Sequence, residues 1–347
     1  MRIRVYWGDE IVIDRPCTIR RRGLYVCSLY TGYLMTRIVF HEDEELRVTV
    51  NLAAVANHQV AFVFSYHRQT NEPLPDTGYA ESWLTRNAFD VVAFMSKQNN
   101  WFQSISTVLL DELNTYLHQT APQHQLRVAM GASMGGYGAM QFAKLLGCTR
   151  VLAFSPQYSI ADNFDSRFLA ESQAITFNWA VTAEMCQRDI EYYIVYDPFH
   201  KMDRLHTAMY EAVETCTVHK YPVRGSGHLT PVYLQQIGCL NALVESVLDG
   251  RGFPNIDHRT LRKQSVLYLN NMAKAMLKRQ KPGIAASILD AAVLAYPDAA
   301  ELRSLQSRAR DEQLSGGRGD AVQTATASAP GIDPLAQRPT RGARVRA

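Results

Sequence analysis

Residues 131–138 read Gly-Ala-Ser-Met-Gly-Gly-Tyr-Gly, and the interpretation of the chain starts from this stretch. The β-prone run 126–130 precedes it, and apolar residues at helical spacing follow it. A Gly-x-Ser-x-Gly turn between a strand and a helix is a nucleophile elbow, which lifts the serine hydroxyl above the sheet. The positions two before and two after the serine must be small because neighbouring backbone passes close by, and glycine occupies both. Ser133 is therefore the candidate nucleophile.

A serine hydroxyl is a poor nucleophile until a base accepts its proton, and His228 is the candidate base. It lies in a Gly-Ser-Gly-His loop between the strand-like run 217–223 and the apolar-periodic segment 232–248, which predicts a helix. A glycine-rich loop with little packing to do suits the presentation of an imidazole. His67 and His200 also follow strand-like runs and remain alternatives.

The base needs a carboxylate that orients it, and two aspartates compete for this role. Asp197 directly follows the β-rich run 191–196, and the acid of such a triad normally lies just past the carboxyl end of a strand. Asp203 lies six residues further on, before the helical pattern of 204–210, where it would also serve as an N-cap. We favour Asp197 and keep Asp203 as the alternative acid.

The candidate nucleophile, acid and base follow one another along the chain in the order Ser, Asp, His. In this order, in its element order and in its motifs, the chain resembles the α/β-hydrolase superfamily over residues 45–249. The run 60–66 is similar to the buried strand before the oxyanion loop, 89–95 is similar to the next strand, and 104–117 is a helix by its period. The resemblance implies the α/β class and an α/β-hydrolase fold, in which a mainly parallel sheet is covered by helices on both faces.

The resemblance also implies an oxyanion hole formed by two backbone N–H groups. One belongs to Met134, the residue after the nucleophile. Many members of the superfamily supply the other from a His-Gly or Gly-Gly-Gly segment after the third strand. Here residues 64–69 read Phe-Ser-Tyr-His-Arg-Gln without a glycine, and Tyr66 is the candidate donor.

The segments that flank or interrupt this core differ from it in their sequence patterns. Residues 1–50 hold three β-prone runs and predict a β-rich segment, packed on or continuous with a hydrolase domain at 51–250. Residues 159–190 form a long connection that in this architecture commonly covers the site. Its aromatic residues either line the site or pack the segment down; they are Phe164, Phe168, Phe177 and Trp179.

Residues 258–312 predict a helical segment. The helices at 265–280 and 283–296 resemble a tetratricopeptide repeat unit in their spacing of large and small residues. One unit cannot bury its faces alone, so we expect it to pack on the hydrolase domain, on the helix predicted at 300–310 or on a protein partner. Residues 313–347 are rich in Ser, Gly, Ala and Pro with five arginines, and predict a disordered basic tail.

Composition narrows the class of protein further. The formal net charge of +3 equals that of the tail alone, so the remainder is near neutral and we expect no nucleic-acid partner. The six cysteines lack paired or metal-ligand spacing, so we expect free thiols, no metal centre and no cofactor. The chain starts without a signal-type apolar run, and no stretch reaches the ~20 apolar residues of a membrane helix. We therefore expect a cytoplasmic protein without a membrane span.

The leading hypothesis is a serine hydrolase that cleaves an ester, thioester or amide of a small-molecule or acyl-carrying substrate. Ser133 would form an acyl-enzyme, with His228 as base and Asp197 as orienting acid. An acyltransferase with the same triad and a non-catalytic interaction protein on the hydrolase fold are the alternatives.

Overall fold

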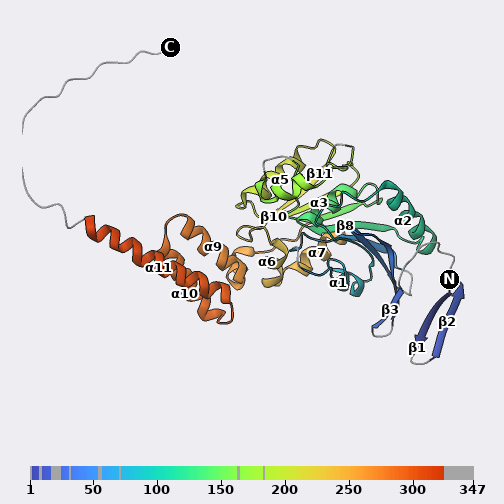
Figure 1. Cartoon of the computed structure of the whole chain (residues 1–347), viewed down its shortest axis with the longest axis horizontal. Helices are drawn as coiled ribbons and strands as arrows, with labels where there is room; N and C mark the ends of the chain where they lie inside the picture. Colours follow the sequence, from blue (N-terminus) through green and yellow to red (C-terminus); the bar gives the residue numbers. More distant parts are fainter. Residues whose placement is uncertain are drawn as a thin grey trace, which may run out of the picture. The chain divides into compact units, whose positions relative to one another are not determined.

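A nine-stranded sheet organises the first two thirds of the chain (Figure 1). In order across the sheet, the strands are β11 (Thr217–Pro222), β10 (Glu191–Tyr196), β9 (Arg150–Phe154), β8 (Leu126–Ala132), β6 (Gln59–Phe64), β7 (Asp90–Ser96), β5 (Leu46–Ala53), β4 (Tyr33–Glu42) and β3 (Tyr25–Tyr30). The strands from β6 to β11 pair in parallel, whereas β5, β4 and β3 extend the sheet antiparallel beyond β7. This is the α/β-hydrolase fold predicted from the sequence.

The computed structural model describes residues 2–7, 10–16, 25–30, 33–53, 57–69, 72–161, 165–182 and 184–323, with side chains within 37–315. A separate two-stranded sheet pairs β1 (Arg2–Trp7) with β2 (Glu10–Pro16). Of the predicted N-terminal segment 1–50, the strands β3 to β5 join the main sheet and are continuous with the core. The strand β4 was not predicted from the sequence.

Eleven helices and two short 3-10 turns occur in the part of the chain that the structure describes. They are α1 (Glu81–Arg86), α2 (Thr107–Thr120), α3 (Met134–Phe142), η1 (Ser166–Phe168), α4 (Leu169–Ala174), α5 (Lys201–Glu211), α6 (Thr230–Gln236), α7 (Leu240–Leu248), α8 (His258–Leu261), η2 (Arg262–Gln264), α9 (Val266–Lys278), α10 (Pro282–Ala295) and α11 (Ala300–Gln323). None of these helices is both long and apolar enough to cross a membrane.

Helices cover both faces of the sheet. Phe62 and Phe64 of β6 belong to a buried cluster with α2, α3 and α5, whereas Ala61 and Val63 belong to a second cluster with α1, α6 and α7. Alternate residues of one strand are thus buried on opposite faces. This explains why the parallel strands read as continuous apolar runs instead of alternating with polar residues.

The single helix predicted over 232–248 is wrong, because the structure has two helices there, α6 and α7. Gly238 adopts a φ of 71° and ends α6. Its N–H donates to the carbonyl of Gln235, and the N–H of Cys239 donates to the carbonyl of Leu234, which closes the last turn. Apolar residues continue through this break, so periodicity alone does not reveal it.

The connection 159–190 contains η1 and α4, followed by an extended stretch. Phe168, Phe177 and Trp179 pack against the cluster on the α2 and α3 face, and the Trp179 indole donates to a backbone carbonyl just before α2. Phe164 lies outside the described residues. The described aromatic side chains therefore pack this segment down onto the core.

The chain divides into two compact units, with the boundary between Asn271 and Met272, inside α9. In the second unit α10 packs along α11, and Leu289 and Leu302 are fully buried. Helices thus occur where the sequence predicted them, and the tetratricopeptide resemblance of 258–312 stays a prediction. The helix α11 continues to Gln323, inside the segment 313–347 that was predicted to be disordered, and residues 324–347 lie outside the described part.

Candidate active site

Ser133 occupies a strained turn between β8 and α3. Its φ of 55° and ψ of −119° are a rare combination for a residue with a side chain. A Cβ on Gly131 would overlap the carbonyl of Gly135, and a Cβ on Gly135 would overlap the carbonyl of Phe64. Direct backbone contact is therefore the reason that the residues two before and two after the serine must be small, as the sequence predicted.

The structure brings His228 to the Ser133 hydroxyl. The distance from His228 Nε2 to Ser133 Oγ is 2.9 Å, and the opposite ring nitrogen, Nδ1, lies 2.8 Å from Asp203 Oδ1. His228 follows β11 and precedes α6, as the sequence indicated. The three side chains form the continuous hydrogen-bonded chain that a serine nucleophile, a base and an orienting acid require.

The carboxylate beside His228 is Asp203, so the preference for Asp197 is corrected by the structure. Asp197 directs Oδ2 at the N–H groups of Gly225 and Gly227, at 3.1 and 2.7 Å. Its Oδ1 accepts the N–H of Phe199 at 2.9 Å. Both aspartates follow β10. The chain turns after Asp197 and enters α5 at once, and this course brings Asp203 to the imidazole.

Asp203 is also not the N-cap of α5. The N-cap is His200, whose Nδ1 lies 3.3 Å from the N–H of Asp203. Asp203 is the third residue of the helix, and its side chain is buried. Its position in the first turn points the carboxylate back toward the end of the sheet, where His228 lies.

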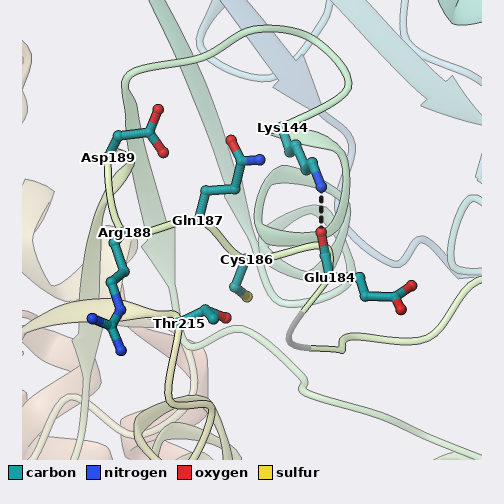
Figure 2. A pocket seen from close by; sticks show the side chains of 7 residues that line it. All are labelled: Lys144, Glu184, Cys186, Gln187, Arg188, Asp189 and Thr215. Carbon is teal, nitrogen blue, oxygen red and sulfur yellow. Dashed lines mark hydrogen bonds between the residues drawn. The ribbon is translucent and has the colours of Figure 1, made fainter.

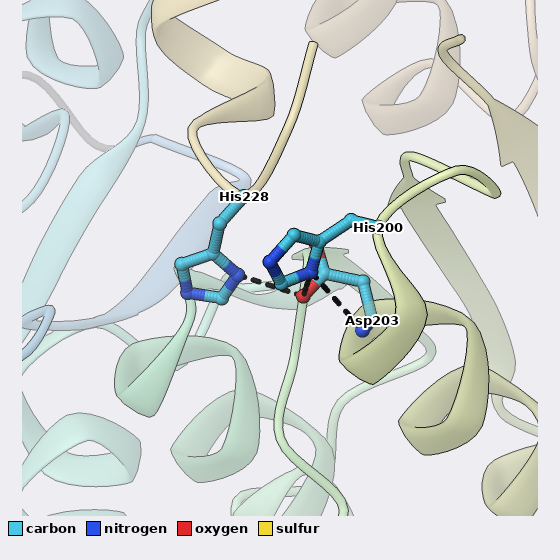
Figure 3. A group of neighbouring side chains, drawn as sticks. All are labelled: His200, Asp203 and His228. Atoms are coloured by element: carbon cyan, nitrogen blue, oxygen red, sulfur yellow. Dashed lines mark hydrogen bonds and ion pairs between the residues drawn. The ribbon is translucent and has the colours of Figure 1, made fainter. Parts of the chain in front are cut away.

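Two histidine rings flank the Asp203 carboxylate (Figure 3). His200 Nδ1 and His228 Nδ1 each lie 2.8 Å from Oδ1. Burial alone would raise the pKa of Asp203, but the hydrogen bonds with His200 and His228 outweigh it and lower the pKa to about 2. Asp203 is therefore ionised at neutral pH, as the stabilisation of an imidazolium requires.

The hydrogen bonds and ion pairs of the two alternative bases join them to carboxylates. His200 contacts Asp203, and His67 Nε2 lies 3.4 Å from Glu171 of α4. The ligand atoms of His200, Asp203 and His228 lie within 4.8 Å of one another, so among the described residues these side chains could hold a metal ion. Hydrogen bonding within the group explains their approach without one.

Gln157 also reaches the nucleophile, and sequence reasoning missed it. Its Nε2 donates to Ser133 Oγ at 2.8 Å, and the residue is fully buried. Gln157 follows β9, the parallel neighbour of β8. Since the carboxyl ends of parallel strands share one edge of the sheet, polar residues just after β9 were candidates for the site.

The segment after β6 lies against the elbow, because the carbonyls of Phe64 and Ser65 contact Gly135. Arg68 braces this segment by donating to the carbonyls of Glu72, Ser96 and Lys97. Such bracing holds the loop without the glycines that many superfamily members have there. Tyr66 lies in this segment and is half exposed, and its N–H as the second oxyanion donor stays a prediction.

A pocket of about 490 Å³ lies away from this site (Figure 2). Asp189 lies just before β10 and Thr215 just before β11, so this pocket adjoins the amino ends of these strands, opposite to the triad. Lys144 donates to the backbone carbonyl of Glu184 across it. Both signs of charge line it, and none of its lining residues belongs to the triad.

Comparison with known proteins places the chain near esterases. Residues 77–204 match a protein-family model described as putative esterase. The matched segment includes Ser133 and Asp203 and ends before His228. No curated protein matches the chain. The family match supports an esterase-type enzyme without specifying a substrate.

Solved structures of similar fold include the capsule O-acetyltransferase of Neisseria meningitidis serogroup A, with 12% identity and a TM-score of 0.42 over 64% of this chain and 96% of that one. An S-formylglutathione hydrolase from Agrobacterium tumefaciens has 14% identity and a TM-score of 0.41, over 57% and 88% of the two chains. Acetyl xylan esterase 1 from Thermoanaerobacterium sp. has 13% identity and a TM-score of 0.39, over 61% and 84%. These values are too low to transfer an activity to this chain.

The contacts of the two aspartates predict different mutant phenotypes. Asp203→Asn should lower kcat on a small ester by roughly 10³- to 10⁴-fold, because the imidazole loses its charged partner. The loss of kcat in Asp197→Asn should be smaller by a factor of at least about ten. The same change should lower the melting temperature, because a buried N–H that loses its acceptor costs about 1–3 kcal/mol of stability. Steady-state kinetics and thermal unfolding measure both effects. An equal or larger kcat loss in Asp197→Asn would return the acid role to Asp197.

The lowered pKa of Asp203 predicts a pH dependence of stability. A carboxyl whose pKa is lower in the folded state stabilises the fold above its unfolded pKa of roughly 4, and this contribution disappears as the pH falls toward 2. The difference in unfolding free energy between wild type and Asp203→Asn should therefore shrink between about pH 5 and about pH 3. Urea unfolding at both pH values measures it, and a difference that grows with acidification would contradict the assignment.

Proposed function

We propose that this chain is a serine hydrolase that cleaves an ester, thioester or amide through an acyl-enzyme on Ser133. The observation that carries the proposal is the hydrogen-bonded chain from Ser133 through His228 to Asp203, on a strained elbow at the edge where the parallel strands end. The family match to putative esterases agrees with this reaction class.

In the first half of the reaction, Ser133 Oγ attacks the carbonyl carbon while His228 Nε2 accepts the hydroxyl proton. The ionised Asp203 stabilises the imidazolium through its hydrogen bond to Nδ1. The carbonyl oxygen becomes an oxyanion, and the backbone N–H of Met134 and that of Tyr66 are the proposed donors to it. When the tetrahedral intermediate collapses, the imidazolium protonates the leaving group and the acyl group stays on Oγ.

In the second half, water takes the place of the leaving group. His228 Nε2 accepts a proton from the water as its oxygen attacks the acyl carbon. Collapse of the second tetrahedral intermediate returns that proton to Ser133 Oγ and releases the acid. If an alcohol of an acceptor molecule replaced the water, the same steps would transfer the acyl group, which is the alternative activity.

Gln157 has a proposed supporting role in these steps. Its amide donates to Ser133 Oγ while His228 lies at 2.9 Å from the same oxygen. A neutral imidazole must accept the hydroxyl proton, so the Gln157 donor occupies a lone pair of the oxygen. This arrangement holds the hydroxyl in one rotamer, with its proton directed at His228 Nε2.

Two exposed apolar side chains are sequence neighbours of histidines at the proposed site. Phe199, directly before His200, is 72% exposed, and Leu229, directly after His228, is 52% exposed. Exposed aromatic and aliphatic groups adjacent to the histidines of a site favour a substrate with an apolar acyl or alcohol part. We therefore propose a small-molecule or acyl-carrying substrate of this kind.

A fluorophosphonate probe tests the nucleophile, because it phosphonylates only an activated serine. The probe should label wild type and should not label Ser133→Ala. The same variant should lose roughly 10⁴- to 10⁶-fold in kcat on small esters. His228→Ala should lose as much, and the double variant should be no worse than either, since members of one catalytic unit are not additive. Losses that multiply would show that His228 is not the base.

The products of turnover separate the two enzyme hypotheses. Release of free acid from the acyl-enzyme indicates hydrolysis, whereas an acylated acceptor formed at the expense of free acid indicates transfer. Absence of labelling in correctly folded wild type, with no ester turnover, would favour the non-catalytic interaction protein instead.

A further inference from the structure

The loop that carries His228 has hydrogen bonds of its own, from Ser226 Oγ to the carbonyls of Val223 and Gly227, but it also contains two glycines at positive φ. Gly225 and Gly227 adopt φ values of 87° and 64°, and glycine is the residue with the most conformational freedom to lose. The imidazole at the end of this loop nevertheless has to stay within hydrogen-bond distance of both Ser133 and Asp203. Groups that contact the loop from outside therefore add to the hold that its own hydrogen bonds provide.

Asp197 holds the loop from the side of the sheet. One of its carboxylate oxygens accepts both glycine N–H groups, and the other accepts the N–H of Phe199 at the turn before α5. Asp197 is 3% exposed, and burial is the main reason that its pKa is raised. This one side chain thus joins the base loop to the turn that delivers Asp203.

The first half of α9 holds the loop from the other side. Asn271 Nδ2 donates to the carbonyl of Gly225 at 3.3 Å. A Cβ on Gly225 would lie 2.6 Å from the ring of Tyr268, and a Cβ on Gly227 would lie 2.8 Å from Asn271 Nδ2. The two side chains therefore contact the loop so closely that a Cβ on either glycine would force one of them to shift.

The beginning of α9 is itself anchored to the helix that follows His228. Ser265 Oγ donates to Gln236 Oε1 of α6 at 2.6 Å, and the N–H of Leu267 donates to the same oxygen at 3.1 Å. The guanidinium of Arg262 lies over the ring of Tyr268, 5.5 Å from its centroid. These contacts all belong to the first compact unit, which ends at Asn271.

We infer that Asn271 and Tyr268 are positioning residues for His228. They press the glycine loop against Asp197 and so set the place of the imidazole between Ser133 and Asp203. This inference rests on the proposed function, and it extends the catalytic machinery past residue 250, where the sequence predicted the hydrolase domain to end. A displacement of about 1 Å in such a group costs up to roughly 10²-fold in rate.

The test uses the full chain with Asn271→Ala, and Asn270→Ala as the matched control on the same helix. Asn271→Ala should lower kcat on a small ester by roughly tenfold to a hundredfold, because the imidazole is no longer held in place. KM should not change, since the Asn271 side chain contacts the glycine loop and not the nucleophile. Asn271→Asp should be at least as impaired, because a carboxylate keeps the shape but cannot donate to the Gly225 carbonyl. Asn270→Ala should retain wild-type kcat.

A spectroscopic readout separates positioning from general stability. The proton in the His228 Nδ1–Asp203 hydrogen bond should give a far-downfield proton NMR signal in wild type and in Asn270→Ala. In Asn271→Ala the signal should shift or broaden while the melting temperature stays near that of wild type. An unchanged signal together with an unchanged kcat would overturn the inference.

Gly227→Ala provides the double-variant test. This change should lower kcat through the clash with the Asn271 amide and through strain at positive φ. The variant Gly227→Ala/Asn271→Ala should lose less than the product of the two single losses, because the clash is removed. Losses that multiply would show that Asn271 does not act through the loop.

Fluorophosphonate labelling distinguishes failure of the inference from failure of the proposed function. No labelling of wild type refutes the proposed function, whereas equal labelling rates of wild type and Asn271→Ala refute only the positioning role.

Discussion

The backbone contact at the elbow is the constraint on which the rest of the site depends. Because Gly135 has no Cβ, α3 can approach until its first turn touches the carbonyl of Phe64 at the end of β6. That approach places the segment of Tyr66 beside the helix N-terminus, whose free N–H groups favour negative charge. The hydroxyl of Ser133 is then turned toward the edge where β9 and β10 end, and residues that follow these strands supply Gln157 and Asp203.

Two buried aspartates near His228 have different hydrogen-bond donors, and this difference underlies the different roles that we propose for them. Asp203 lies between the ring nitrogens of two histidines, groups that can gain a full positive charge, so it can respond to the charge that develops on His228. The hydrogen bonds that the structure gives Asp197 come from backbone N–H groups, which cannot gain charge. We propose that the first kind of carboxylate stabilises the charged imidazolium without taking up its proton, whereas the second kind fixes the course of the chain.

Sequence patterns predicted most of the fold because buried parallel strands and amphipathic helices leave local signals. The runs 150–154 and 191–196 coincide with β9 and β10, and the elbow lies where its motif placed it. The choice between Asp197 and Asp203 had no local signal, since it depends on how tightly the chain turns before α5. Gln157 was missed for the same reason, because strand adjacency and not sequence distance brings it to Ser133.

The glycine-rich histidine loop shows how support from a distant segment becomes necessary. Asp197 can accept two N–H groups of the loop only because Gly225 and Gly227 take backbone conformations that other residues avoid. The same freedom makes the loop costly to order, and carboxylate contacts on one side leave its outer side without support. The first turns of α9 fill that side, anchored through α6. A triad built on such a loop therefore depends on residues that sequence patterns assign to a separate helical segment at 258–312.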